Sequence, residues 1–224
     1  MDVLSKGINL IHIFEYEWTD SAKQKKLIDI INMRLHPENN RVIYARECTL
    51  KDVDPAESTE FQDKWHLMGS SSAQIHIGLY FKDELVGLMT FGKSRFNRTV
   101  DWELVRLVWK APVVVVGGAE KLLKHFISKY KPQSIVTYAD ITKFTGSVYK
   151  KLGFKLDGIT DPEYIWYNPN TKVKASRYAT QKNRLVKLGL GTEAESEMDI
   201  MHNLGYFRIY DCGNLRFIWR NTIE

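Results

Sequence analysis

The feature that most constrains the fold is a segment in which a strand-like run leads through two glycines into an amphipathic helix. Residues 113–116 are four valines, and Gly117 and Gly118 precede a helical pattern with apolar side chains at positions 122, 123, 126 and 127. A second buried-strand pattern, residues 133–140, follows this helix. The order strand, helix, strand predicts an α/β or α+β domain in which helices pack against a sheet.

The remaining segments alternate between strand and helix patterns. Strands are expected at residues 8–14, 41–50, 73–81, 84–91, 102–110 and 163–168, and helices at residues 21–35 and 54–66 and before the Leu-Gly-Phe stretch that ends at residue 154. After Gly205, two aromatic-rich runs flank a turn at residues 211–214, which predicts a C-terminal β-hairpin. We therefore expect an N-terminal strand-helix segment (1–40), a larger α/β or α+β domain (41–168) and an extension with a basic helix and a C-terminal hairpin (169–224).

Composition excludes several classes of protein. The chain has 224 residues, enough for a full core, and its formal net charge of +5 favours an acidic partner. Cys48 and Cys212 are the two cysteines and lack neighbouring ligands, which argues against a disulfide framework or a zinc ribbon. His12, Glu15 and Glu17 interrupt the apolar N-terminal stretch, so we expect no signal peptide or membrane span and a cytoplasmic protein.

The basic residues are concentrated in two places. One is the loop of residues 93–98, and the other is residues 170–189, which contain no acidic residue. Interleaved aromatic side chains could stack on bases while the cations bind phosphates, although a solvated helix face is the alternative. We expect double-stranded DNA as a partner, contacted by Lys93, Arg95, Arg98, Lys172, Lys174, Arg177, Lys182 and Arg184.

Four further features could carry chemistry. The Gly117-Gly118 turn would present free backbone amides to an anion, or it is a plain tight turn. Asp140 ends a strand that should be central, where it could act as a base or cap the following turn. His66 could be a base or a metal ligand, or a solvated helix end. Arg106, in an apolar strand, would require an anionic partner if buried or would lie on a solvated face.

The segments VVGGAEKLLKHF, SIVTYAD and GSVYKKLGFKLDG resemble the acyl-CoA-binding core of the GNAT acyltransferase superfamily. In that family a glycine-rich turn before a helix binds the pyrophosphate, and a Tyr-x-x-Leu-Gly-Phe stretch follows the next strand. Residues 149–154 match this stretch. The resemblance implies a GNAT-like mixed central sheet and an acyl-CoA or related donor that is bound by Val116, Gly117, Gly118 and Ala119.

Residues 66–158 more closely resemble the Mom-type proteins of bacteriophages, a GNAT-like branch that modifies adenine in DNA as an anti-restriction device. The likeness rests on His66 with its small-residue loop, Arg106, the glycine pair, Asp140 and the segment ending at Tyr149. It implies a catalytic set of His66, Arg106, Asp140 and Tyr149. An iron ion is also implied, for which His66 and Asp140 would be the candidate ligands.

Residues 8–50 resemble the end of the Vsr-like nuclease domain of phage homing endonucleases, which implies a DNA-contacting remnant. The leading hypothesis is a DNA-modifying transferase that flips its target base out of the stack. In it Asp140, with His66, accepts or orients the amine proton and Tyr149 protonates the leaving group. The alternatives are a non-catalytic DNA-binding remnant and an ordinary N-acetyltransferase.

Overall fold

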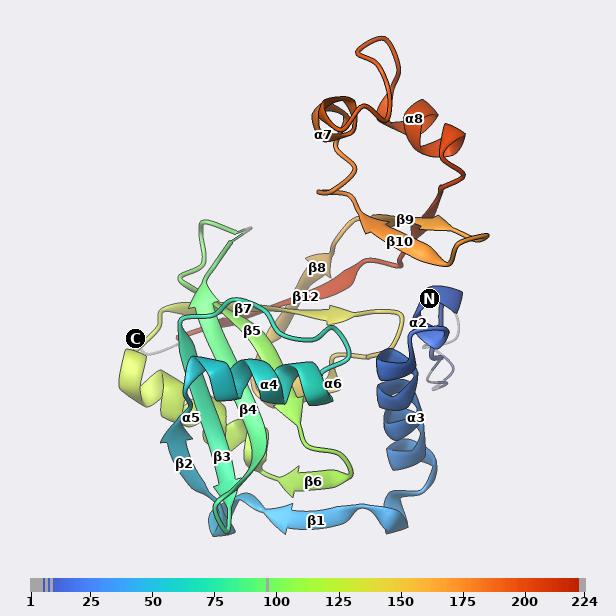
Figure 1. The fold of residues 1–224 in the computed structure, drawn as a ribbon. Helices are drawn as coiled ribbons and strands as arrows, with labels where there is room; N and C mark the ends of the chain where they lie inside the picture. The colour runs from blue at the N-terminus through green and yellow to red at the C-terminus, as the bar shows by residue number, and fades with distance from the viewer. Residues whose placement is uncertain (1–5, 7, 9, 96, 222–224) are drawn as a thin grey trace. The chain divides into compact units, whose positions relative to one another are not determined.

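A computed structural model describes residues 6, 8, 10–95 and 97–221 (Figure 1). The chain forms two compact units, each assembled from segments that are distant in sequence. Unit 1 comprises residues 1–21, 140–144 and 159–214, and unit 2 comprises residues 22–139, 145–158 and 215–224. The division into the ranges 1–40, 41–168 and 169–224 follows the chain instead and stays a prediction.

Unit 2 is built on a seven-stranded sheet with the order β2-β3-β4-β5-β7-β12-β8. Its strands are β2 (Thr49–Asp52), β3 (Ile75–Phe81), β4 (Glu84–Lys93), β5 (Trp102–Trp109), β7 (Ser134–Asp140), β8 (Lys155–Ile159) and β12 (Asn214–Arg220). Neighbours from β2 to β5 are antiparallel, whereas β5 and β7 are parallel. The predicted α+β class with a mixed central sheet is confirmed.

Four helices belong mainly to unit 2: α3 (Ser21–Leu35), α4 (Pro55–Trp65), α5 (Gly118–Tyr130) and α6 (Ser147–Lys151). Helix α5 covers one face of the sheet, where the rings of Phe91 and Phe126 stack at 3.6 Å. Helix α4 packs through Phe61 against Leu88 and Val108, which belong to a separate cluster of buried side chains. Because side chains alternate between the two faces of a strand, α4 and α5 lie on opposite sides of the sheet (Figure 1).

The strand predicted for residues 41–50 is divided into two. Strand β1 (Arg41–Tyr44) pairs in parallel with β6 (Val113–Val116), and β2 joins the large sheet after a 3₁₀ turn at Ala45–Glu47. The Lys121 ammonium donates to the carbonyls of Ala45 (2.8 Å) and Cys48 (2.6 Å). These bonds from α5 satisfy carbonyls that a continuous strand would have used in its ladder.

Unit 1 contains a three-stranded antiparallel sheet with the order β10-β9-β11. Its elements are α2 (Glu15–Trp18), β9 (Tyr164–Asn168), β10 (Val173–Ser176), α7 (Lys182–Lys187), α8 (Glu197–Asn203) and β11 (Phe207–Tyr210). The core is formed by Trp166 together with Leu185 from α7 and Ile200 and Met201 from α8. Glu197 binds the indole N–H of Trp166 at 3.0 Å, so the buried ring has its hydrogen-bond partner.

Two predicted elements differ in the structure. The tail strands β11 and β12 form as expected but do not pair with each other, because β11 pairs with β9 and β12 joins the large sheet. The described residues of the segment 8–14 form no strand, and Phe14 instead caps α2. Residue 9 of that segment lies outside the described residues. The helix predicted for residues 21–35 is confirmed, as are the helices at α4, α5 and α6.

Candidate active site

The large sheet opens between β5 and β7. These parallel strands form only two residue pairs, Trp102 with Ile135 and Glu103 with Val136. The Thr137 hydroxyl then donates to the Leu104 carbonyl at 3.0 Å, so a side chain replaces the next rung of the ladder. Beyond this point the rest of β5 has no ladder partner on its β7 side among the described residues. Its backbone amides are therefore available to a ligand.

A β-bulge lies in β5 at the start of this opening. Phe91 pairs with Leu104 and Thr90 pairs with Arg106, so Val105 is an extra residue in the ladder between β4 and β5. The bulge places Arg106 on the same face as Thr90. The Arg106 guanidinium donates from Nε to the Gly69 carbonyl (3.2 Å) and from Nη1 to the Val105 carbonyl (3.0 Å).

Arg106 is partly buried without a carboxylate partner among the described residues. The nearby Glu103 is buried and pairs with Arg95 at 2.7 Å. Burial lowers the pKa of the Arg106 guanidinium, and the positive charge of Arg95 adds to this effect. The sequence predicts either a buried guanidinium with an anionic partner or a guanidinium on a solvated face, and each prediction describes Arg106 only in part. The guanidinium is half-buried, and its hydrogen bonds go to backbone carbonyls.

His66 is the C-cap of α4 and interacts electrostatically with Arg106. Its Nδ1 atom accepts the backbone N–H of Met68 at 3.2 Å, so the neutral ring carries its proton on Nε2. Burial, together with the charges of Arg106 and Lys26, lowers the pKa of His66 to about 3. The side chain is therefore a neutral hydrogen-bond donor at physiological pH rather than a base.

Tyr149 lies on α6, with its ring packed near Phe154 and Phe217 at centroid distances of 5.9 and 5.6 Å. Its hydroxyl interacts with the side chain of Thr137, the residue that ends the ladder between β5 and β7. Burial raises the pKa of the Tyr149 hydroxyl, so it keeps its proton at neutral pH. The structure brings His66 close to Arg106, because Gly69 accepts from Arg106 and donates its N–H to the His66 carbonyl at 3.0 Å. Tyr149 belongs to the same unit and interacts with Arg106 electrostatically.

The glycine turn is attached to the same strand β5. Gly117 adopts a left-handed conformation (φ 76°) as the N-cap of α5, which favours glycine. A Cβ atom on Gly118 would lie 2.6 Å from Cη2 of Trp109, the last residue of β5. Both glycines therefore have a packing explanation. The turn also leaves the amides of residues 118–120 without protein acceptors among the described residues, because the first bond is from Lys121 to the Gly117 carbonyl.

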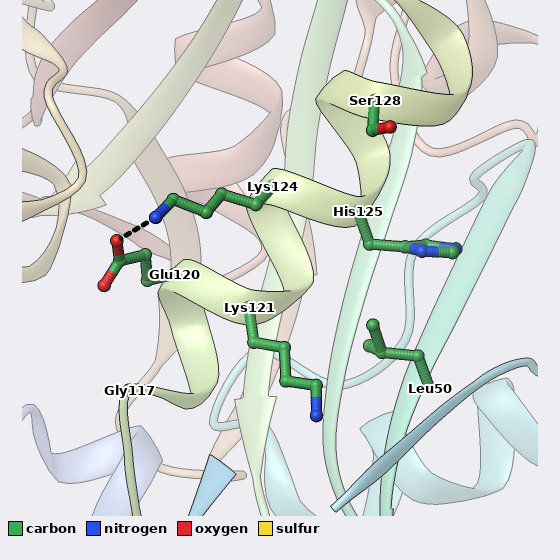
Figure 2. Close-up of a pocket in the computed structure, with 7 residues that line it drawn as sticks. All are labelled: Leu50, Gly117, Glu120, Lys121, Lys124, His125 and Ser128. Carbon is green, nitrogen blue, oxygen red and sulfur yellow. Dashed lines mark ion pairs between the residues drawn. The ribbon is translucent and has the colours of Figure 1, made fainter. Parts of the chain in front are cut away.

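A cavity of about 500 Å³ runs along α5 from the glycine turn (Figure 2). It is lined by Leu50, Gly117, Glu120, Lys121, Lys124, His125 and Ser128. Lys124 pairs with Glu120 at 2.6 Å, and Lys121 is bonded to backbone carbonyls. Of the predicted donor-binding residues, Gly117 lines this cavity. Val116 and Ala119 flank the glycines at the end of β6 and in the first turn of α5.

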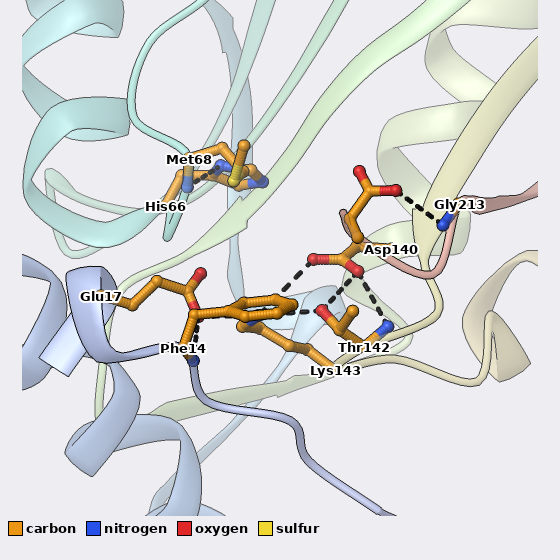
Figure 3. A network of polar contacts seen from close by, with 9 residues as sticks. Phe14, Glu17, His66, Met68, Asp140, Thr142, Lys143 and Gly213 are labelled. Atoms are coloured by element: carbon orange, nitrogen blue, oxygen red, sulfur yellow. Dashed lines mark hydrogen bonds and ion pairs between the residues drawn. The ribbon is translucent and has the colours of Figure 1, made fainter. Parts of the chain in front are cut away.

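Asp140 is described with unit 1, where it caps the turn that follows β7 (Figure 3). Its Oδ1 accepts from the Thr142 backbone (2.8 Å) and hydroxyl (2.5 Å). Its Oδ2 lies 3.8 Å from the ammonium of Lys143, which is itself buried against Glu17 at 3.1 Å. The capping alternative therefore describes the contacts of Asp140, and its catalytic role stays a prediction.

Most of the predicted DNA-binding lysines are occupied by partners in the same unit. In unit 1, Lys172 pairs with Glu15, Lys174 with Asp20 and Lys182 with Glu193. In unit 2, Lys93 lies over the Trp102 ring and Arg95 pairs with Glu103, while Arg98 is exposed. Arg177 and Arg184 lie over the rings of Tyr164 (5.4 Å) and Tyr178 (3.6 Å). Neither of these two arginines has an ion pair within the described residues.

The implied iron ion finds no ligand set. No group of three or more His, Cys, Asp or Glu side chains is arranged to hold a metal within the described residues. The residues present therefore do not fit the iron site that the Mom-type resemblance implies. In the same part of the chain, every helix is too short or too polar to span a bilayer.

Comparisons with known proteins come from solved structures alone, because no protein-family model and no curated protein matches. The chain is similar to a GNAT-family acetyltransferase from Bacillus cereus (11% identity, 79% of this chain and 99% of the other, TM-score 0.42). It is also similar to a Bacillus subtilis acetyltransferase in complex with CoA (13%, 78% and 99%, TM-score 0.44). The chain is also similar to a GNAT-family acetyltransferase from Elizabethkingia anophelis with acetyl-CoA bound (14% identity, 78% of this chain and 99% of the other, TM-score 0.42).

At these identities and TM-scores the likeness carries no argument about activity or substrate. The resemblances to Mom-type proteins and to a Vsr-like segment stay predictions from the sequence. Sequence reasoning missed Thr137, which ends the ladder, and Trp109, on which Gly118 packs. The signal for Thr137 was a threonine within an apolar strand. No local sequence pattern indicates the role of Trp109.

The neutral state of His66 predicts a pH dependence of stability. Its pKa in the folded protein is about 3, below the ordinary value of 6.5, so between these values only the unfolded chain binds the proton. Stability is therefore lost as pH falls below about 6.5. A His66→Asn variant keeps an acceptor for the Met68 N–H but does not titrate.

Urea unfolding between pH 7 and 4.5 measures this effect. We expect wild type to lose stability relative to His66→Asn, with a slope difference that approaches about 1.4 kcal/mol per pH unit. Parallel curves for the two proteins would show that His66 is protonated in the folded state as readily as in the unfolded one.

Proposed function

We propose that the protein is a GNAT-like acyltransferase that moves an acyl group from acyl-CoA to an amine. The observation that carries the proposal is the early end of the β5–β7 ladder, with the protonated Tyr149 hydroxyl bonded at the point of separation. The free amides at the start of α5 belong to a turn that packs on the other end of β5, through Gly118 and Trp109. One strand thus connects a site for anionic phosphates with a proton donor.

The reaction follows from these groups. Amides of residues 118–120 bind the phosphates of the donor, and the acyl thioester lies along the unpaired part of β5. The amine attacks the thioester carbonyl, whose developing negative charge is stabilised by backbone N–H groups of β5. A C–N bond forms, the C–S bond breaks, and Tyr149 protonates the departing thiolate. The proton that the amine loses passes through water and restores the Tyr149 hydroxyl.

Donor binding gives the first test. Val116 is 48% exposed next to the glycine turn, so its side chain can change without disturbing the core. Val116→Glu places a negative charge where the donor phosphates bind, and Val116→Gln is the uncharged control of the same size. We expect calorimetry with acetyl-CoA to give saturable binding for wild type and Val116→Gln and at least tenfold weaker binding for Val116→Glu.

Two outcomes would count against the proposal. If the folded wild-type protein does not bind acetyl-CoA, the proposal that acyl-CoA is the donor is wrong. Equal affinities of Val116→Glu and Val116→Gln for acetyl-CoA would show that the donor phosphates do not bind at the glycine turn.

DNA modification is the second candidate function, and one observation favours it. Arg177 and Arg184 lie over tyrosine rings without ion pairs within the described residues, an arrangement that suits phosphate binding beside stacked bases. The lysines of the same segment are paired with carboxylates and should contribute less. The proposed DNA contact is therefore carried by arginines rather than by the whole basic segment.

A salt series separates these contributions. We expect the double variant Arg177→Gln/Arg184→Gln to weaken binding to a DNA duplex and to reduce the slope of log K against log salt by about 2. The matched variant Lys172→Gln/Lys174→Gln should change the slope by less than half as much. Fluorescence anisotropy measures both, and an equal effect of the two pairs, or no affinity for DNA, would contradict the assignment.

A further inference from the structure

We propose that Arg106 is the centre of a subsite for a carboxylate, so that the acceptor is a small amine that also carries a carboxylate group. This inference rests on the proposed acyl transfer and names its substrate class. The first observation concerns the charges around Arg106 in unit 2. The Arg106 cation is partly buried, and Glu103, the acid that acts on it, is already neutralised by Arg95.

The guanidinium is only partly satisfied by the protein. Nε and Nη1 donate to the carbonyls of Gly69 and Val105, while Nη2 has no acceptor among the described residues. Backbone carbonyls orient the group but do not neutralise it. A half-buried cation without a counter-ion is unfavourable, so an anion that arrives with the substrate gains a strong, charge-assisted contact.

The side chains around Arg106 are also hydrogen-bond donors. His66 presents Nε2–H, because its Nδ1 accepts from Met68. Thr90 pairs with Arg106 across the β4–β5 ladder, and its fully buried hydroxyl has no partner within the described part of the chain. The Arg106 cation and these donors suit a ligand group that only accepts hydrogen bonds and carries a negative charge.

A carboxylate fits this requirement better than a phosphate monoester. Arg106 supplies one positive charge, His66 is neutral, and the nearby Lys26 ammonium is bonded to the carbonyls of Asp63 and His66. A dianionic phosphate would keep one uncompensated negative charge in a partly buried place. The planar carboxylate also matches the guanidinium edge, in which Nη2 is free. Arg106 follows the bulge directly, so the carboxylate would be bound beside the unpaired part of β5 where the amine attacks.

The test compares acceptors that differ only in charge. Folded protein with acetyl-CoA is given phenylalanine, phenylalaninamide and phosphoethanolamine, and acetylated products are quantified by mass spectrometry. We expect the amino acid to be preferred over its amide by roughly 10- to 100-fold in kcat/KM. Arg106→Gln should reduce this ratio to about 1, and Arg106→Lys should retain part of it. Acetyl-CoA affinity and the urea midpoint of Arg106→Gln are the controls for a structural effect.

A second measurement does not depend on turnover. N-acetylphenylalanine should raise the unfolding temperature of wild type, whereas N-acetylphenylalaninamide should not, and Arg106→Gln should abolish the difference. Equal acetylation of acid and amide, or a preference for phosphoethanolamine, overturns the carboxylate subsite while the acyltransferase proposal stands. If acetyl-CoA does not bind, the proposed function fails, and the product-binding arm alone decides whether Arg106 binds a carboxylate.

Discussion

The candidate site depends on the separation of β5 from β7 after two paired residues. A Thr137 hydroxyl takes the place of the next ladder bond, and the bulge at Val105 changes the register on the other side of β5. Strand β5 therefore has a continuous antiparallel neighbour on one side and an open edge on the other. Unpaired backbone amides in a sheet are unfavourable when dry, so an opening of this kind suits a ligand with carbonyl oxygens, such as a thioester or an amide product.

Strand β5 also connects the opening to α5, the amphipathic helix that follows the glycine pair. Trp109 ends β5 and contacts the first residue of α5, and a Cβ atom on Gly87 would also lie 2.2 Å from its ring. Two glycines thus make room for one indole, which fixes the start of α5 against the end of β5. Backbone conformation and packing explain the glycine pair. The proposed anion binding uses only the free backbone amides of residues 118–120 and no side chain.

Much of the fold was predictable because most elements carry local signals. Helix α3 follows the predicted range of residues 21–35, and the hairpin turn at Lys82 and Asp83 takes positive φ at both positions. Strand partners were less predictable, because pairing is decided by distant residues. The turn at residues 211–214 looks like a hairpin, yet β12 joins the large sheet. The break at Ala45 depends on Lys121, which follows it by 76 residues.

The candidate site was predicted in part. His66 lies close to Arg106, Tyr149 belongs to the same unit, and Asp140 is bonded to Thr142 and Lys143. The catalytic set that the Mom-type resemblance implies stays a prediction. The sequence could not give the role of His66, since the tautomer is set by a backbone N–H two residues later. It also could not distinguish arginines over aromatic rings from lysines in ion pairs, because those partners come from other elements.

The most direct test of the acyltransferase account is an NMR titration of ¹⁵N-labelled protein with acetyl-CoA. The account predicts saturable shift changes at the amides of residues 118–120 and of β5 from Val105 onward, with a simultaneous change at the Tyr149 ring. Shift changes confined to unit 1, or the absence of any saturable change in folded protein, would contradict it.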